Sequence, residues 1–267
     1  MTLSTTAAAE DPGRCLSDSS RIPLSMRHGH SGPLDMHATA LGLATGDATA
    51  LERVKAHVLD AAFPCLAARS AINSRRAHFG SYGPLGSREP QRLQALCDAL
   101  TAFTDTYPDP GEAPVTFIAL FDDDVHDEVE FEQRLWCHLQ LLHDCDRLQF
   151  GWAHDVSSDP ESSNFSFSIG GRAFFVVGLH PRASRLARRA PVPCLAFNFH
   201  DQFEQLRVSG KYDKLQRSIR SRDVALQGDA NPVLARFGEA SEAMQYSGRA
   251  VSAGWQCPFR PGAQDAD

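Results

Sequence analysis

The stretch Phe165-Ser-Phe-Ser-Ile-Gly-Gly-Arg-Ala-Phe-Phe-Val-Val-Gly-Leu179 decides the fold prediction for this chain. Large apolar residues alternate with small polar ones at 165–169, which is the period of a half-buried strand. The Gly-Gly pair that follows is typical of a tight turn, and residues 172–179 then return as a second apolar strand. The stretch therefore predicts an antiparallel hairpin.

Two histidines follow predicted strands on either side of an arginine-rich segment. His180 ends the hairpin, and Pro181 restricts it to extended geometry. Residues 194–199 predict a further strand that delivers His200. Between the two histidines, arginines recur at helical spacing, at Arg182, Arg185, Arg188 and Arg189. The pattern predicts that two imidazoles and an arginine face converge, with Arg182 or Arg185 near the His180 corner and Arg188 and Arg189 exposed.

The rest of the chain mixes strands and helices without a regular repeat. Residues 115–121 predict a strand, and 80–86 a loop. Apolar residues at helical spacing predict helices at about 51–62, 91–103, 127–142, 212–226 and 237–246. A Gly-rich nucleotide fingerprint is missing, which argues against a Rossmann fold. We therefore expect an α+β fold, with a small central mixed or antiparallel sheet packed by helices.

Length and composition indicate one domain with short tails. The chain has 267 residues, of which 42% are hydrophobic and 22% charged, an ordinary globular composition. Residues 1–46 are rich in Ala, Ser, Thr, Gly and Pro, which predicts a disordered tail. We expect the folded domain at 47–260 and a second disordered tail at 261–267.

Charge and cysteine usage exclude several classes of function. The formal charge of −7, without a lysine-rich run, gives no footprint for nucleic acid. An apolar run long enough to cross a membrane is lacking. Seven cysteines, an odd number without a Cys-x-x-Cys pair, favour neither a disulfide framework nor a zinc ribbon. We therefore expect a cytoplasmic protein.

Several unusual strings in this chain resemble the YqcI/YcgG family. They are FPCLAA, FSFSIGGRAFFVVGLHPRASRLARR, FNFHDQFEQLR and SGRAVSAGWQCPF, in that order, and the resemblance covers roughly residues 50–260. Its described members are haem-dependent enzymes that oxidise guanidino or amino nitrogens. They include an L-arginine Nω-hydroxylase of D-cycloserine biosynthesis, a pre-guanitoxin N-hydroxylase and a lysine N6-nitrating oxygenase. The chain departs from the family pattern at residues 228–234.

The resemblance implies non-covalent haem b as an iron cofactor. His180 and His200 are then the candidate iron ligands, because a neutral imidazole is a good donor to haem iron. Arg182 and Arg185 are the candidate partners of the haem propionates, since guanidinium groups match carboxylates. Cys65 is the alternative ligand, because a thiolate also binds haem iron. Each of these residues also suits a purely structural role, as do the less favoured His143 and His154.

The resemblance further implies oxygenation of a cationic amino acid, with L-arginine as the leading substrate. A guanidinium keeps its proton at any ordinary pH and is a poor nucleophile, so acid–base residues alone cannot oxygenate it. We expect His200 and Glu204 to act in catalysis and Glu239 and Glu242 to hold the cation. The expected co-substrates are O2 or peroxide, and an electron-donor protein completes the reaction with O2.

The sequence leaves three alternatives open. A haem-binding sensor or carrier would share the ligands but turn over no amine. An N-oxygenase could instead act on lysine N6 or on another guanidino metabolite. A non-haem diiron enzyme would need two Glu-x-x-His motifs, which the chain lacks. The run of residues 122–124 with His126 suits a surface cap better than a metal site.

Overall fold

A computed structural model describes residues 45–229, 231, 239–252 and 254–262 of the chain. Within these ranges five strands form one sheet in the order β1-β2-β5-β4-β3. Their bounds are β1 Ala77–Ser81, β2 Thr116–Leu120, β3 Phe167–Ile169, β4 Arg172–Leu179 and β5 Cys194–Phe199. Strands β1 and β2 run parallel and the other neighbours antiparallel. The predicted α+β class with a small mixed sheet is confirmed.

Strands β3 and β4 form the predicted hairpin. Gly170 and Gly171 make its turn with φ of 60° and 69°, a left-handed conformation that favours glycine. Strand β3 is shorter than expected, because Phe165 bridges to Ser157 rather than to β4. The hairpin places β4 beside β5, and these two strands hold the middle of the sheet together.

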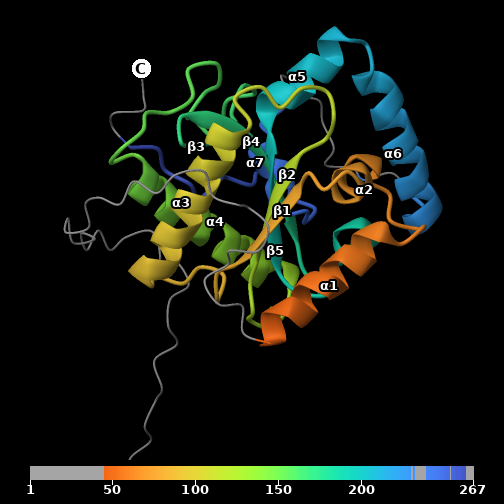
Figure 1. Ribbon diagram of the computed structural model, residues 1–267, viewed down its shortest axis with the longest axis horizontal. Helices are drawn as coiled ribbons and strands as arrows, with labels where there is room; N and C mark the ends of the chain where they lie inside the picture. Colours follow the sequence, from red (N-terminus) through yellow and green to blue (C-terminus); the bar gives the residue numbers. More distant parts are fainter. Residues whose placement is uncertain (1–44, 230, 232–238, 253, 263–267) are drawn as a thin grey trace, which may run out of the picture.

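Helices cover both faces of the sheet (Figure 1). Helices α3 and α4 lie on one face, and α1, α2, α5 and α6 lie on the other. The bounds in the described ranges are α1 Thr45–Leu59, α2 Leu66–Asn73, α3 Pro90–Thr106, α4 Glu128–Asp146, α5 His200–Val208, α6 Tyr212–Gln227 and α7 Ala243–Tyr246. The short helix α7 contacts β4. The sheet is therefore the middle of three layers.

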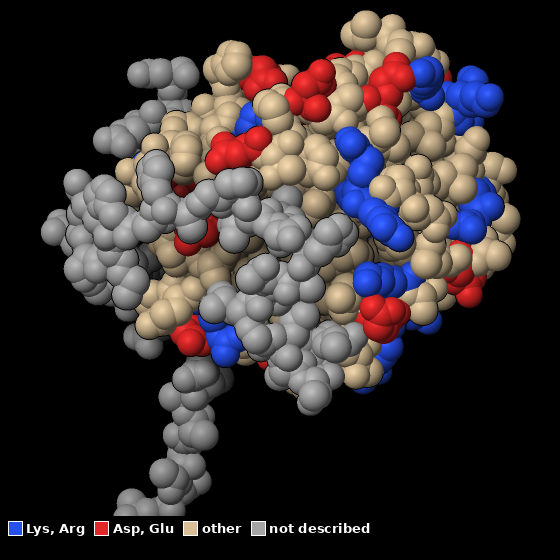
Figure 2. Space-filling model, viewed as in Figure 1, with Lys and Arg blue, Asp and Glu red and all other residues tan. Residues whose placement is uncertain are grey.

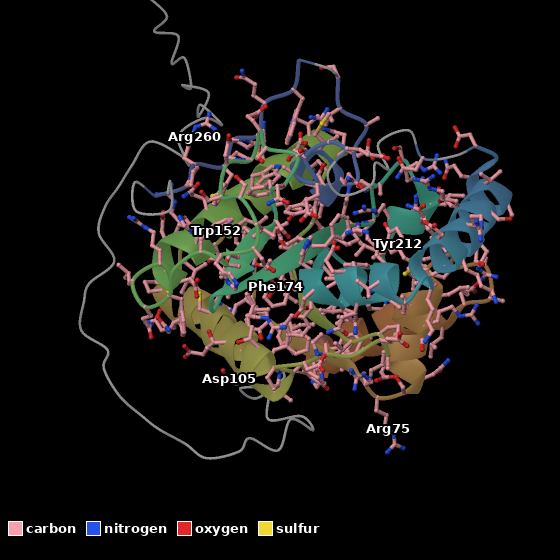
Figure 3. The ribbon with its side chains drawn as sticks, turned by 90° about the horizontal axis from the view of Figure 1, so that it is seen from above. Arg75, Asp105, Trp152, Phe174, Tyr212 and Arg260 are labelled. Atoms are coloured by element: carbon pink, nitrogen blue, oxygen red, sulfur yellow. The ribbon has the colours of Figure 1, made fainter. Side chains whose placement is uncertain are left out.

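The larger hydrophobic core lies between the sheet and the helices α3 and α4. Phe174 lies near the middle of the molecule (Figure 3), and its ring stacks on that of Phe199 at 4.9 Å between centroids. Phe103 of α3 stacks on Phe199 at 4.7 Å. Helix α4 approaches β4 so closely that a Cβ on Gly178 would lie 2.7 Å from Phe131 and Leu135 side-chain atoms. Gly178 thus permits the close packing of α4 on the sheet.

The sequence missed three elements. Strand β1 has no apolar alternation and partly overlaps the predicted loop at 80–86, because it is a half-buried edge strand. Helices α2 and α5 were not predicted. The predicted arginine-bearing helix is wrong, since only the 3-10 turn Leu186–Arg188 forms there.

Some expectations fall outside the described residues. These are most of the expected tails, at 1–44 and 263–267, part of the divergent segment at 228–234, and the start of the helix expected at 237–246. Its end forms α7. Within the described ranges we find no helix long and apolar enough to cross a membrane.

Candidate functional site

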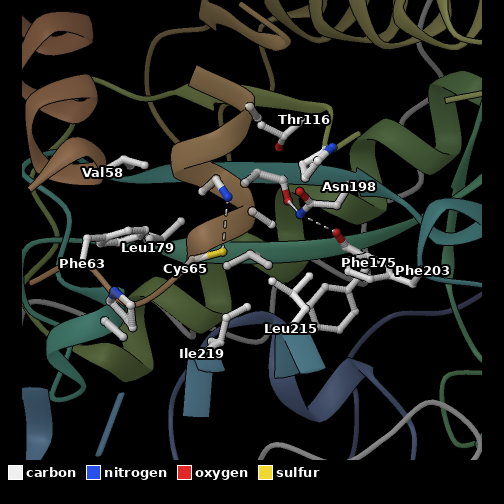
Figure 4. A pocket seen from close by; sticks show the side chains of 18 of the residues that line it. Val58, Phe63, Cys65, Thr116, Phe175, Leu179, Asn198, Phe203, Leu215 and Ile219 are labelled. Atoms are coloured by element: carbon white, nitrogen blue, oxygen red, sulfur yellow. Dashed lines mark hydrogen bonds between the residues drawn. The ribbon is translucent and has the colours of Figure 1, made fainter. Parts of the chain in front are cut away.

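A cavity of about 320 Å³ lies between the sheet and the helices α1, α2 and α6 (Figure 4). Its volume lies at the lower end of the usual range for small-molecule and cofactor sites. Its walls are mainly apolar and include Val58, Phe63, Phe175, Leu179, Leu215 and Ile219. Such a cavity suits a flat, largely apolar ligand whose polar groups meet a few polar side chains.

The period of strand β4 decides which residues reach this cavity. Phe175, Val177 and Leu179 alternate along the strand and line the cavity. Phe174 and Val176 point to the opposite core. Because neighbouring strand residues face opposite sides of a sheet, a shift of one position would exchange the two sets.

His200 lies in the cavity wall as the first residue of α5. It is 5% exposed, and burial lowers the pKa of its imidazole to about 4. The ring is therefore neutral at neutral pH, which is the form that binds a metal ion. Its Nε2 lies 3.6 Å from an Oε1 of Glu204, one turn along the helix.

Cys65 also lines the cavity and caps the N-terminus of α2 (Figure 4). Its Sγ accepts a hydrogen bond from the backbone N–H of Ala68 at 3.5 Å. Burial raises the pKa of the thiol, while the backbone N–H groups and the charge of Arg188 act in the opposite direction. Cys65 is thus a buried thiol beside groups that would stabilise a thiolate.

His180 is not brought together with His200. It follows Leu179 on β4, but its ring turns to the other face of the sheet and stacks on Phe131 of α4, with 4.1 Å between centroids. Burial lowers the pKa of its imidazole to about 4, and Nδ1 has no hydrogen-bond partner within the described residues. His180 is therefore a core residue in this arrangement and does not line the cavity.

The arginines are arranged differently from the prediction. Arg182 is exposed, and Arg185 is buried in ion pairs with Asp223 and Asp229. Neither lines the cavity. The exposed position expected for Arg188 is wrong, since this residue is 8% exposed and lines the cavity.

In the part of the chain that the structure describes, Arg188 donates to backbone carbonyl groups. Its NH1 bonds to the oxygens of Gly178 at 2.9 Å and Tyr246 at 3.3 Å, and its NH2 bonds to that of Gln245 at 3.0 Å. Burial lowers the pKa of its guanidinium to about 10. Among the described residues no carboxylate pairs directly with it. The charge of the nearby Asp223 favours the protonated guanidinium, so Arg188 has one anionic neighbour in addition to its neutral hydrogen-bond partners.

Of the three predicted glutamates, one reaches the cavity. Glu204 is half-exposed and pairs with Arg207, and Glu239 is exposed. Glu242 is 3% exposed, lines the cavity and contacts the hydroxyl of Tyr246 at 2.6 Å. Burial raises the pKa of Glu242 to about 8.

Asp223 is a cavity residue that the sequence reasoning missed. Its Oδ2 pairs with Arg185, whereas its buried Oδ1 has no hydrogen-bond partner within the described residues. It follows Leu215 and Ile219 on α6 at intervals of four, so a lone carboxylate stands within the apolar stripe of that helix. This interruption of the apolar stripe was the feature of the sequence that could have identified Asp223 as a candidate site residue.

Basic side chains gather over the half of the molecule that contains α1 and α6 (Figure 2). Two further basic residues, Arg207 of α5 and Arg220 of α6, line the cavity. In the described ranges no group of three His, Cys, Asp or Glu side chains could hold a metal ion by itself. The run 122–124 is used structurally, since Asp123 pairs with Arg134 and accepts from the N–H of Leu85.

Comparison with known proteins identifies the family. The chain matches no curated protein and no solved structure. The family model described as YqcI/YcgG matches residues 54–260, a range that contains His200, Cys65, Arg188, Asp223 and Glu242. Because this match spans well over half of the sequence, the chain belongs to the YqcI/YcgG family.

Proposed function

We propose that this chain is a haem-dependent N-oxygenase that converts L-arginine to Nω-hydroxy-L-arginine, as in D-cycloserine-type antibiotic biosynthesis. The family resemblance suggests the reaction. The observation that carries the proposal is the cavity, in which an imidazole, a thiol, a buried arginine and two buried carboxyl groups meet apolar walls.

The residues present fit haem b. Apolar walls suit the porphyrin, and His200 is a neutral imidazole in the same cavity. Arg188 offers a buried cation without a paired carboxylate among the described residues, which suits a propionate. Bound haem would supply the oxygen-activating chemistry that the side chains lack.

Each residue then has a distinct task. His200 would hold the haem iron, and Glu204, with its Oε1 3.6 Å from Nε2 of His200, lies on the side from which a ligating imidazole could be oriented. Arg188 and Arg207 are better placed for the propionates than Arg182 and Arg185, which do not line the cavity. The apolar walls exclude water from the reacting groups.

The substrate cation has two buried carboxyl groups within reach of the cavity. Asp223 has the stronger case, because its Oδ1 is buried without a partner within the described residues. A guanidinium donating to that atom would satisfy it. Glu242 is the second carboxyl group, but burial raises its pKa to about 8, so it is less suited than Asp223 to pair with a cation at neutral pH.

Haem titration tests the cofactor and its ligand. The purified chain should bind added haemin with a Soret band, and the reduced carbon-monoxide complex should have the position typical of imidazole ligation. His200→Ala should lose haem or leave a site that free imidazole refills, whereas Cys65→Ala should keep the spectrum. A strongly red-shifted carbon-monoxide complex that disappears in Cys65→Ala would transfer the ligand role to Cys65, and failure to bind haemin would overturn the proposal.

Turnover separates the enzyme from a haem sensor or carrier. Haem-loaded protein with a reductant system should add one oxygen atom to L-arginine, measured as a mass gain, and should act less well on lysine and on other guanidino compounds. Asp223→Asn should raise KM for L-arginine more than it lowers kcat, because it removes a ground-state charge contact. Intact haem binding without oxidation of any amine or guanidine would favour the sensor or carrier.

A further inference from the structure

Glu242, which lines the cavity, belongs to a set of four buried polar atoms whose contacts constrain the position of one proton. The Tyr246 hydroxyl lies 3.0 Å from the N–H of Phe167, 3.1 Å from the carbonyl oxygen of Phe174 and 2.6 Å from Oε1 of Glu242. The amide N–H can only donate and the carbonyl can only accept. The phenol has one proton of its own, so it can donate to one of the two remaining oxygens but not to both.

An ionised Glu242 would leave the three contacts of the Tyr246 hydroxyl one proton short. Tyr246 would donate either to the carboxylate or to the Phe174 carbonyl, and the other buried oxygen would face the phenol oxygen with no hydrogen between them. A protonated Glu242 removes the conflict, because the carboxylic acid donates to Tyr246, which then donates to Phe174. All three contacts become hydrogen bonds, as buried polar groups require.

We propose that Glu242 rests as a neutral carboxylic acid and acts as a proton donor when O2 is reduced in the cavity. This inference deepens the proposed function and rests on it for the acceptor of the proton. Hydroxylation of a nitrogen by O2 converts N–H, O2, two electrons and two protons into N–OH and water. The electrons come from a reductant such as an electron-donor protein, and the protons come from solvent. Glu242, which is buried in the cavity lining, donates one proton at a time and is reprotonated from solvent after each transfer.

The surroundings of Glu242 can stabilise the carboxylate that remains after the proton has left. When the carboxyl group ionises, the Tyr246 hydroxyl can rotate from the Phe174 carbonyl to the carboxylate. The buried Ser166 hydroxyl and, to a smaller extent, the charge of Arg207 on α5 also favour the ionised form. Burial is the larger effect and raises the pKa of Glu242 to about 8, close to the pH at which an enzyme works.

Infrared difference spectroscopy of the full chain without haem tests the resting state. At pH 7 a carbonyl-stretch band of a protonated carboxylic acid should be present, should titrate away near pH 8, and should be missing from Glu242→Gln. Glutamine can still donate to Tyr246, so this variant should fold. Tyr246→Phe should move the titration to higher pH, because the ionised form loses a donor. A Glu242 that is already ionised at pH 7 would overturn the inference, whatever the cofactor.

Turnover then tests the use of the proton. Glu242→Gln should reduce O2-driven hydroxylation about 100-fold, in the usual range for loss of a general acid. Peroxide already contains the two protons, so peroxide-driven hydroxylation should change little. The matched control is Glu89→Gln, at the start of α3 on the other face of the sheet, and should leave both rates unchanged. An equal loss of both rates in Glu242→Gln would refute proton donation, whereas lack of haem binding would refute only the proposed function.

Discussion

Arg188 shows how much a single side chain can depend on its surroundings. It belongs to a run of arginines that look alike in the sequence, yet Arg182 is exposed while Arg188 is buried. Its guanidinium joins a carbonyl of β4 to two carbonyls of the α7 region. A planar guanidinium with five donors can span such a set, which the single ammonium of a lysine cannot do in the same geometry.

Replacement of Arg188 by methionine should destabilise the protein by about 2–4 kcal/mol, because buried carbonyl oxygens lose charged donors. Chemical denaturation monitored by circular dichroism would measure the free energy of unfolding. Arg182→Met is the matched control and should change it by no more than about 0.5 kcal/mol, as is usual for an exposed position. Equal effects of the two variants would show that the carbonyl contacts contribute little.

At the scale of elements, the packing of α4 on β4 organises the molecule. Gly178 lets Phe131 and Leu135 approach the strand, and the same helix supplies the surface on which His180 stacks. Leu179, which lies between Gly178 and His180 in the sequence, faces the opposite side of the sheet and lines the cavity. Alternate residues of β4 therefore face opposite sides of the sheet, one set packing in the large core and the other lining the cavity.

A methyl group at Gly178 should disturb this contact. Gly178→Ala places a Cβ 2.7 Å from side-chain atoms of Phe131 and Leu135, so overpacking should cost about 1–3 kcal/mol of unfolding free energy. Urea denaturation would measure this cost. Gly151→Ala is the control, because nothing lies within 4 Å of its added Cβ. If α4 can shift freely, the two variants will be equally stable.

At the scale of the whole molecule, the buried imidazoles of three histidines make the free energy of unfolding decrease at acidic pH. Burial lowers the pKa of His138, His180 and His200 to about 4. Each ring is neutral in the fold and titrates near 6.5 when unfolded. Between these two values the unfolded chain binds more protons, so the stability from the neutral rings is complete above pH 6.5 and is lost as the pH falls toward 4.

Stability should therefore fall from pH 6.5 to pH 4. For His138, which is 2% exposed, the loss should approach about 1.4 kcal/mol for each pH unit. Thermal unfolding at a series of pH values in constant salt would record this loss of stability.

Glu242 has the opposite effect on stability. Its raised pKa makes stability fall as the pH rises from the ordinary pKa of a glutamate to about 8. Glu242→Gln should remove this alkaline decline and leave the acid decline, and a decline that persists in the variant would contradict the assignment.

The sequence by itself determined the local elements with strong periods. The hairpin of β3 and β4, the strand β5 and the helices α3, α4 and α6 follow from apolar spacing and turn residues, because these act over a few neighbouring positions. Family membership also followed from strings of adjacent residues, and the comparison confirmed it.

Only the tertiary structure decided which residues share the cavity. Four residues from distant parts of the chain line the same cavity, namely Cys65, Arg188, His200 and Glu242. A strand's period says that His180 and Leu179 face opposite sides, but it does not say which side holds the cavity. That choice depends on the helices packed against each face, and their packing is set by long-range contacts that no local pattern records.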